Sequence, residues 1–185
     1  MRLGHIVSAG LGRIGPPSPA TAYAGAVSAE PARRKPRHDS VTREIAATPE
    51  AIFDVLSDPS RHPRLDDSGM VLASVDAEVV TASGQVFRME MTMGGVNRYQ
   101  TDNRVFVFEP GRAIGWSVAE AGAEPLGWTW RFDLEPSATG TLVTQTYDWS
   151  QVTDTETLQM IPFPAVPREA RLETLALLAE LVETP

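Results

Sequence analysis

Few residues of this 185-residue chain are of the types that carry out chemistry. There is no cysteine, which excludes thiolate nucleophiles, disulfides and cysteine-ligated zinc or iron–sulfur sites. Of the three histidines, His5 and His38 lie in a segment rich in Gly, Pro and Ala, which leaves only His62 in the rest of the chain. One histidine with scattered carboxylates lacks the spacing of a metal site. We therefore expect no metal ion and no cofactor.

Two short motifs are typical of nucleotide-binding proteins and of serine hydrolases, and the sequence supports neither class. Residues 10–15 fit the G-x-G-x-x-G pattern of dinucleotide-binding loops, but no strand precedes them and prolines follow at once. The chain has no G-x-S-x-G sequence, and a serine nucleophile would have only His62 to pair with. Nucleotide binding and triad hydrolysis are therefore poor interpretations.

Asp66 and Asp67, next to Ser68, are the remaining candidates for acid–base chemistry. Neighbouring residues of an extended segment point to opposite sides, so only one of them can face a site. The simpler interpretation is a solvated loop that caps a strand. The functional interpretation is an acid–base pair of His62 with one aspartate at the mouth of a pocket.

The N-terminal segment differs in character from the rest of the chain. Residues 1–39 contain prolines at 16, 17, 19, 31 and 36 and show no sustained hydrophobic period, so we expect a disordered extension followed by one domain over residues 40–185. Polar residues and glycines interrupt the apolar stretch near the start, so we expect a cytoplasmic protein without a signal peptide. No run of residues is long and apolar enough to predict a membrane span.

Charge is divided unevenly along the chain. Residues 1–37 carry six Arg or Lys and one Glu, whereas the rest carries ten Arg and 23 Asp or Glu. A domain this acidic should repel nucleic acid and anionic lipid surfaces. The sequence makes no prediction of the oligomeric state.

The hydrophobic pattern predicts an α+β fold. A strand at residues 41–47 precedes Thr48-Pro49-Glu50, where Thr48 can cap a helix that Pro49 begins. A short helical turn follows at 60–64. Strands at 70–80, 85–93, 96–108, 113–120, 126–135 and 141–149 alternate in hydrophobicity between turn signals, which indicates an antiparallel meander. A long amphipathic helix from residue 167 to about 182 ends the chain. We thus expect a seven-stranded curved antiparallel sheet with two short helices and a long C-terminal helix over a cavity.

Large side chains recur on one face of these predicted strands. We predict that they line the cavity together with three inward polar groups: Phe87, Met89, Met91, Met93, Trp116, Trp128 and Trp130, with Tyr99, Gln145 and Tyr147. His62 and Asp66 lie at the predicted mouth. The alternative interpretation of the same residues is ordinary core packing.

Several segments resemble the START/Bet v 1-like (SRPBCC) superfamily and, within it, the polyketide cyclase/dehydrase-like proteins. The resemblance is carried by residues 43–56, with 58–63, 108–112, 132–136 and 140–144. It covers about residues 40–183 and implies the helix-grip fold. Because these segments are turns, caps and core positions, they carry no catalytic residue over to this chain, and fold alone does not fix function.

Three functions fit this resemblance. The leading hypothesis is a binding or carrier protein for a small hydrophobic molecule such as a lipid, polyketide or aromatic metabolite. The second is a cyclase or dehydratase in which Tyr99, Tyr147 or His62 moves protons. The third is a protein-interaction module of the chaperone-activator type, for which a filled cavity and an exposed apolar patch would be the signature.

Overall fold

The computed structural model of the protein describes residues 36–93 and 95–183. In chain order the elements are β1 (His38–Ile45), α1 (Pro49–Leu56), the 3-10 helix η1 (Pro59–Leu65), β2 (Val71–Ser74), β3 (Val86–Met93), β4 (Asn97–Glu109), β5 (Ala113–Glu120), β6 (Thr129–Pro136), β7 (Thr141–Asp148), α2 (Thr155–Met160) and α3 (Arg168–Glu183). The seven strands form one antiparallel sheet in the order β1-β7-β6-β5-β4-β3-β2.

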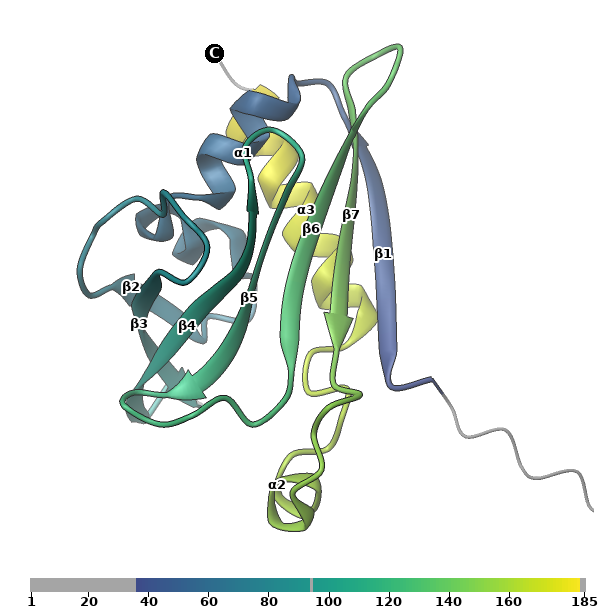
Figure 1. The fold of residues 1–185 in the computed structure, drawn as a ribbon. Helices are drawn as coiled ribbons and strands as arrows, with labels where there is room; N and C mark the ends of the chain where they lie inside the picture. Colours follow the sequence, from purple (N-terminus) through teal and green to yellow (C-terminus); the bar gives the residue numbers. More distant parts are fainter. Residues whose placement is uncertain (1–35, 94, 184–185) are drawn as a thin grey trace, which may run out of the picture. The chain divides into compact units, whose positions relative to one another are not determined.

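Helix α3 covers one face of this sheet. Figure 1 shows it running behind β6 and β7, with α1 beside its C-terminal half. Its buried residues Leu175, Leu178 and Ala179 share one core with sheet residues such as Phe132 and Val143. This arrangement confirms the α+β helix-grip fold that the sequence predicts. The described residues contain no helix that is both long enough and apolar enough to cross a membrane.

Both short helices begin with a capping side chain, and the sequence predicts the first of these caps, Thr48. The Thr48 hydroxyl accepts a hydrogen bond from the Ala51 amide at 3.3 Å, and Pro49 occupies the first helical position of α1. Asp58 caps η1 in the same way, accepting from the Ser60 amide at 3.0 Å. Both short helices lie beside α3 and pack on the same face of the sheet, α1 against β5 and β6 and η1 against β2.

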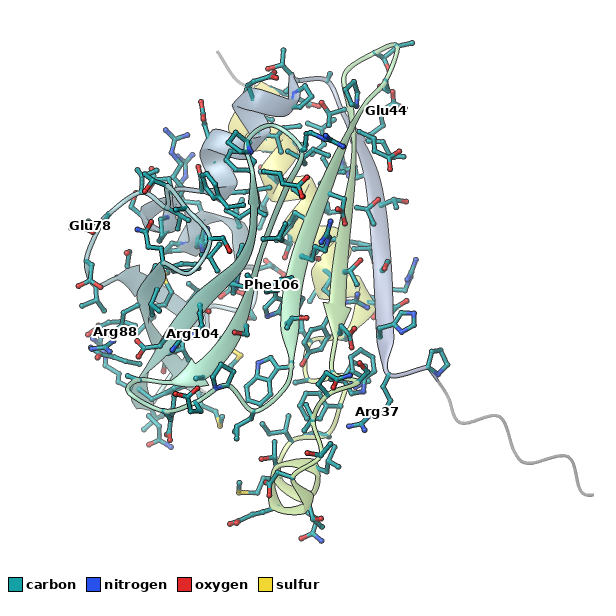
Figure 2. All side chains as sticks on the ribbon, viewed as in Figure 1. Arg37, Glu44, Glu78, Arg88, Arg104 and Phe106 are labelled. Carbon is teal, nitrogen blue, oxygen red and sulfur yellow. The ribbon has the colours of Figure 1, made fainter. Side chains whose placement is uncertain are left out.

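The first strand begins earlier than predicted. We expected order from about Val41, but β1 starts at His38, and the Arg37 guanidinium donates to the Val152 carbonyl at 2.7 Å (Figure 2). The amide of Trp149 donates back to the Arg37 carbonyl at 2.9 Å. Residues 37–39 therefore belong to the folded domain. The rest of the predicted disordered extension, residues 1–35, lies outside the described residues.

Two further elements differ from the sequence-based expectation. The strand predicted at 70–80 is shorter in the structure and ends at Ser74. Its pairing with β3 contains a register shift between Val71 and Ala73, and the chain leaves the sheet after Ser74. The short helix α2 was not predicted, since Pro162, Pro164 and Pro167 indicated an irregular link. Its N-terminus is nevertheless capped by Asp154, which accepts from the Thr157 amide at 2.7 Å.

Candidate functional site

The sheet register places three large aromatic residues side by side under α3. Trp116 of β5 is paired with Trp130 of β6, and Trp130 is paired with Tyr147 of β7. Paired residues of antiparallel strands point to the same face, so these side chains form a continuous surface that we call the aromatic row. Tyr147 is in turn paired with Asp39 of β1, which ends the row.

Other rings extend the Trp116 end of the row. The His62 ring stacks on Trp116 with centroids 5.3 Å apart, and Phe87 meets both of these rings edge-on. Phe132 stacks on the other side of Trp116 at 5.8 Å. The predicted pocket residues His62, Phe87 and Trp116 are thus in direct contact.

At the other end of the row, the link between β7 and α3 closes over Tyr147. The rings of Trp130 and Tyr147 are stacked with centroids 4.1 Å apart. The ring of Phe163, in the link, packs against three rings at centroid distances of 5.9 to 6.4 Å: Trp128, Tyr147 and Trp149. Trp128 does not lie in β6 as predicted, because the strand begins at Thr129. Between residues 151 and 167 only Val152 and Thr157 are buried.

A glycine is required where the loop before β6 meets this link. Gly127 has a φ of +105°, and a Cβ at this position would lie 2.4 Å from the carbonyl oxygen of Gln151. Any side chain would therefore push the loop away from the link. This close approach places Trp128 against Phe163.

A buried arginine of α3 lies over the β1 end of the row. Arg171 is 1% exposed, donates to the Asp39 carbonyl at 2.9 Å and is bonded to the Asp39 carboxylate. Arg168 reaches the same carboxylate at 3.0 Å. The hydrogen bond from Arg171 is the main reason that the pKa of Asp39 lies below its ordinary value, although burial opposes the shift.

Two buried polar atoms next to this ion pair have no hydrogen-bond partner. They are the Nε of Arg171 and the Oε1 of Gln145, a side chain that is only 4% exposed. Such orphaned groups are rare because each costs the free energy of its lost hydration. Gln145 was among the predicted pocket residues, whereas Arg171 was not.

The two predicted mouth residues are not paired with each other. The His62 Nε2 lies 2.9 Å from the Leu56 carbonyl, and burial is the main cause that lowers the pKa of the ring. The Asp66 carboxylate accepts from the amides of Ser68 at 3.1 Å and Val71 at 2.8 Å, and from the Ser68 hydroxyl at 2.6 Å. Asp66 is therefore a loop-capping residue, as in the simpler interpretation.

The predicted lining residues of β3 and β4 differ in how deeply they are buried. Met89 is buried and Met91 is partly buried, opposite Tyr99 on β4. Met93, at the tip of the hairpin, is 61% exposed and so does not belong to an enclosed lining. Burial raises the pKa of Tyr99, as it does that of Tyr147.

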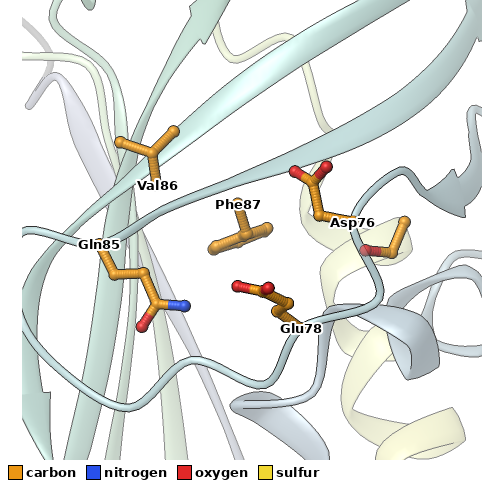
Figure 3. Close-up of a pocket in the computed structure, with 6 residues that line it drawn as sticks. Asp76, Glu78, Gln85, Val86 and Phe87 are labelled. Carbon is orange, nitrogen blue, oxygen red and sulfur yellow. The ribbon is translucent and has the colours of Figure 1, made fainter.

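The space between sheet and helix is filled by the side chains of the protein itself. A hollow of about 190 Å³ lies instead beside the loop after β2, lined by Ser74, Asp76, Glu78, Gln85, Val86 and Phe87 (Figure 3). A second of about 40 Å³ lies outside β4 and β5, lined by Val86, Asp102, Arg104, Ala119, Ala123 and Pro125. Neither is lined by a residue of α3. Among the described residues, most side chains of the predicted site are thus packed in the main core and in the neighbouring aromatic cluster.

Sequence reasoning missed three residues of this region. Arg171 was not among the predicted pocket residues, yet it lies four residues before Leu175 and seven before Leu178, on the same helical stripe. That spacing was a usable signal. Asp39 was assigned to the extension, and Phe163 lay in a link with no periodic pattern to place it.

A long helix over a curved antiparallel sheet is the architecture of the helix-grip fold. The comparison with protein families agrees with this class. Residues 37–177 match the family described as "Polyketide cyclase / dehydrase and lipid transport". The match covers most of the chain, and the protein belongs to this family.

A curated relative has no described function. An uncharacterized protein of Mycobacterium tuberculosis, Rv0088, is 34% identical over 107 residues, which are 57% of this chain and 45% of the relative. The chain thus spans about half the length of the curated relatives that it matches.

Solved structures support the fold alone. Protein CV1439 from Chromobacterium violaceum is 20% identical with a TM-score of 0.62, over 81% of this chain and 100% of its own. Protein Ms6760 from Mycobacterium smegmatis is 16% identical with a TM-score of 0.61, over 80% of this chain and 91% of its own.

Proposed function

We propose that this protein binds a small hydrophobic molecule, such as a lipid, a polyketide or an aromatic metabolite, between the sheet and α3. The observation that carries the proposal is the aromatic row, Trp116, Trp130 and Tyr147, set side by side by the strand register beneath the helix. Flat rings offer a guest large apolar contact and favourable stacking geometry. Family membership supports the same class of function.

The guest would take the place of contacts that the link between β7 and α3 now makes with the row. Two rings of the link pack on Tyr147, Trp149 with ring centroids 5.1 Å away and Phe163 with ring centroids 6.4 Å away. Between residues 151 and 167 the link buries only Val152 and Thr157. A segment with so few buried contacts opens at low free-energy cost. Burial of ~200 Å² of apolar ligand surface then supplies roughly 5 kcal/mol before the costs of association.

The site favours binding over proton-transfer chemistry. A cyclase needs a base, but the Nε2 of His62 lies within hydrogen-bond distance of the Leu56 carbonyl, and burial disfavours protonation of the ring. Burial raises the pKa values of Tyr99 and Tyr147, which keeps both hydroxyls protonated at neutral pH. These tyrosines can donate hydrogen bonds to a guest, and they are poor bases.

A second candidate is a protein-interaction module. It is favoured by the filled interior and by exposed apolar side chains, among them Val96 at 82%, Met160 at 68% and Met93 at 61%. The two candidates differ in what they bind. A binding protein takes up a small apolar molecule under α3, whereas an interaction module uses its outer surface.

Native mass spectrometry tests the proposal. The freshly purified protein is measured alone and with a panel of fatty acids, alkylphenols and naphthalene derivatives. A one-to-one complex with at least one class is expected, and Trp130→Leu should weaken it about fivefold or more because a stacking surface is lost. Phe106→Ala is the matched control, since Phe106 is 46% exposed on β4 (Figure 2). No complex with any compound would contradict the proposal and leave the interaction module as the leading function.

A further inference from the structure

Two orphaned atoms, the Nε of Arg171 on α3 and the Oε1 of Gln145 on the inner face of the sheet, offer hydrogen bonds to the polar part of a guest. We infer that the site selects apolar molecules that carry a hydroxyl group, such as a phenol or an alcohol, and that this hydroxyl binds Arg171 and Gln145. The inference rests on the proposed function and names its ligand class.

The two residues meet at the β1 end of the aromatic row, Gln145 through the sheet register and Arg171 of α3 through its bonds to Asp39. Asp39 is paired with Tyr147, and Val41 is paired with Gln145, so Asp39 and Gln145 are diagonal neighbours on the covered face. Arg171 is bonded to both the carbonyl and the carboxylate of Asp39, which holds its guanidinium beside this position. The aromatic row ends here, at Tyr147.

Their chemistry is complementary in one specific way. The Nε of Arg171 carries a proton and can only donate, whereas the Oε1 of Gln145 can only accept. A hydroxyl group accepts one hydrogen bond and donates another, so a single hydroxyl can satisfy both atoms. A carboxylate or an ether only accepts, which would leave the Gln145 oxygen without a partner.

The positive charge of Arg171 does not by itself favour an acidic guest. Its guanidinium is already bonded to the Asp39 carboxylate, and Arg168 lies 3.0 Å from the same carboxylate. The two arginines and Asp39 together carry a net charge of +1, but the Arg168 side chain is 51% exposed and its charge is screened by solvent. A carboxylate entering beside Arg171 would lose its hydration and would meet the Asp39 carboxylate, which repels it.

Three ligands that share the para-propylphenyl group test the inference: para-propylphenol, its methyl ether and para-propylbenzoate. The affinity of each for the full chain is measured by titration of the protein amide resonances. The phenol should bind about tenfold more tightly than the ether, since one satisfied donor–acceptor pair changes affinity by roughly this factor. The benzoate should bind no better than the ether.

Gln145→Met removes the acceptor while keeping a side chain of similar length. In this variant the ratio of the phenol and ether affinities should fall to about one, because the hydroxyl proton loses its partner. Gln100→Met is the matched control: Gln100 lies on the opposite face of β4, paired with Glu90, and its replacement should leave the ratio unchanged. Thermal melts of both variants establish that they are folded.

The outcomes separate the inference from the function on which it rests. Binding of none of the three ligands to the wild type contradicts the proposed function. Equal binding of phenol and ether, as when an ordered water already satisfies both atoms, overturns the hydroxyl inference while the proposed function stands. Tightest binding of the benzoate, or a ratio that Gln145→Met does not change, overturns the inference as well.

Discussion

At the scale of single residues, the burial of His62 should make the stability of the folded protein depend on pH. Its ring is stacked on Trp116 and its Nε2 lies 2.9 Å from the Leu56 carbonyl. Burial is the main cause that lowers its pKa below the ordinary 6.5, against smaller opposing effects of the Leu56 carbonyl and Asp58. In the unfolded chain the ring takes up a proton near its ordinary pKa, whereas in the folded protein it stays neutral to lower pH.

Stability should therefore fall as the pH drops. Between about pH 7.5 and about 5.5, the wild type should lose about 1 kcal/mol of unfolding free energy, because only the unfolded state binds the proton. Urea unfolding at the two pH values measures this loss. His62→Phe keeps an aromatic ring but cannot titrate, so its stability should change less over this interval. An equal loss in the variant would show that another group is responsible.

Asp39 has a structural role that the sequence did not reveal. In a chain that begins at Pro36, Asp39→Ala leaves Arg171, which is 1% exposed, without its carboxylate. We expect a loss of about 2 kcal/mol, less than for a fully buried pair because Asp39 remains 37% exposed. The same chain without the substitution keeps the pair and should unfold like the full chain. Equal melting of both shortened chains would show that Asp39 contributes nothing.

At the scale of elements, α3 holds the site together because it covers the inner face of the sheet. Leu175 is fully buried in the common core, whereas Leu172, on the same helix, is 42% exposed. Leu175→Asp should cost more than about 3 kcal/mol, since it removes apolar contacts and buries a carboxylate. Leu172→Asp should cost less than about 1 kcal/mol. Thermal unfolding compares the two, and similar melting temperatures would contradict the assigned face of α3.

The elements that the sequence predicted well are those with strong local signals. Thr48 and Pro49 define the start of α1, and alternation across the six meander strands defines the sheet. The register that brings Trp116, Trp130 and Tyr147 together also follows from these hairpins. The helix α2 and the early start of β1 could not be predicted, because prolines and a charged segment obscure them.

Whether the interior is a cavity or a packed core could not be predicted from the sequence, for a different reason. The same apolar faces predict a cavity or a packed core, depending on how far large side chains interdigitate. Phe132 stacking on Trp116, and Phe163 reaching Tyr147 from the link, fill space that the sheet and helix alone would leave open. The orphaned Arg171 and Gln145 atoms likewise result from tertiary packing, which no local pattern encodes.

At the scale of the whole molecule, the central claim is that an apolar guest binds against the aromatic row. The fluorescence of the four tryptophans can report on the binding of such a guest, and these residues form two pairs. Trp116 and Trp130 belong to the row, whereas Trp128 and Trp149 pack on Phe163 of the link, and Trp149 also borders the row at Tyr147 with ring centroids 5.1 Å apart. A guest on the row must change the surroundings of the first pair directly.

The most direct test is a titration of intrinsic tryptophan fluorescence with fatty acids and alkylphenols. The account predicts a saturable change in the wild type and in the double variant Trp128→Phe/Trp149→Phe. The change should be largely lost in Trp116→Phe/Trp130→Phe, which keeps aromatic rings in the row but removes its indoles. The absence of a saturable change in the wild type, or its survival in Trp116→Phe/Trp130→Phe, would contradict the claim that the row is the binding surface.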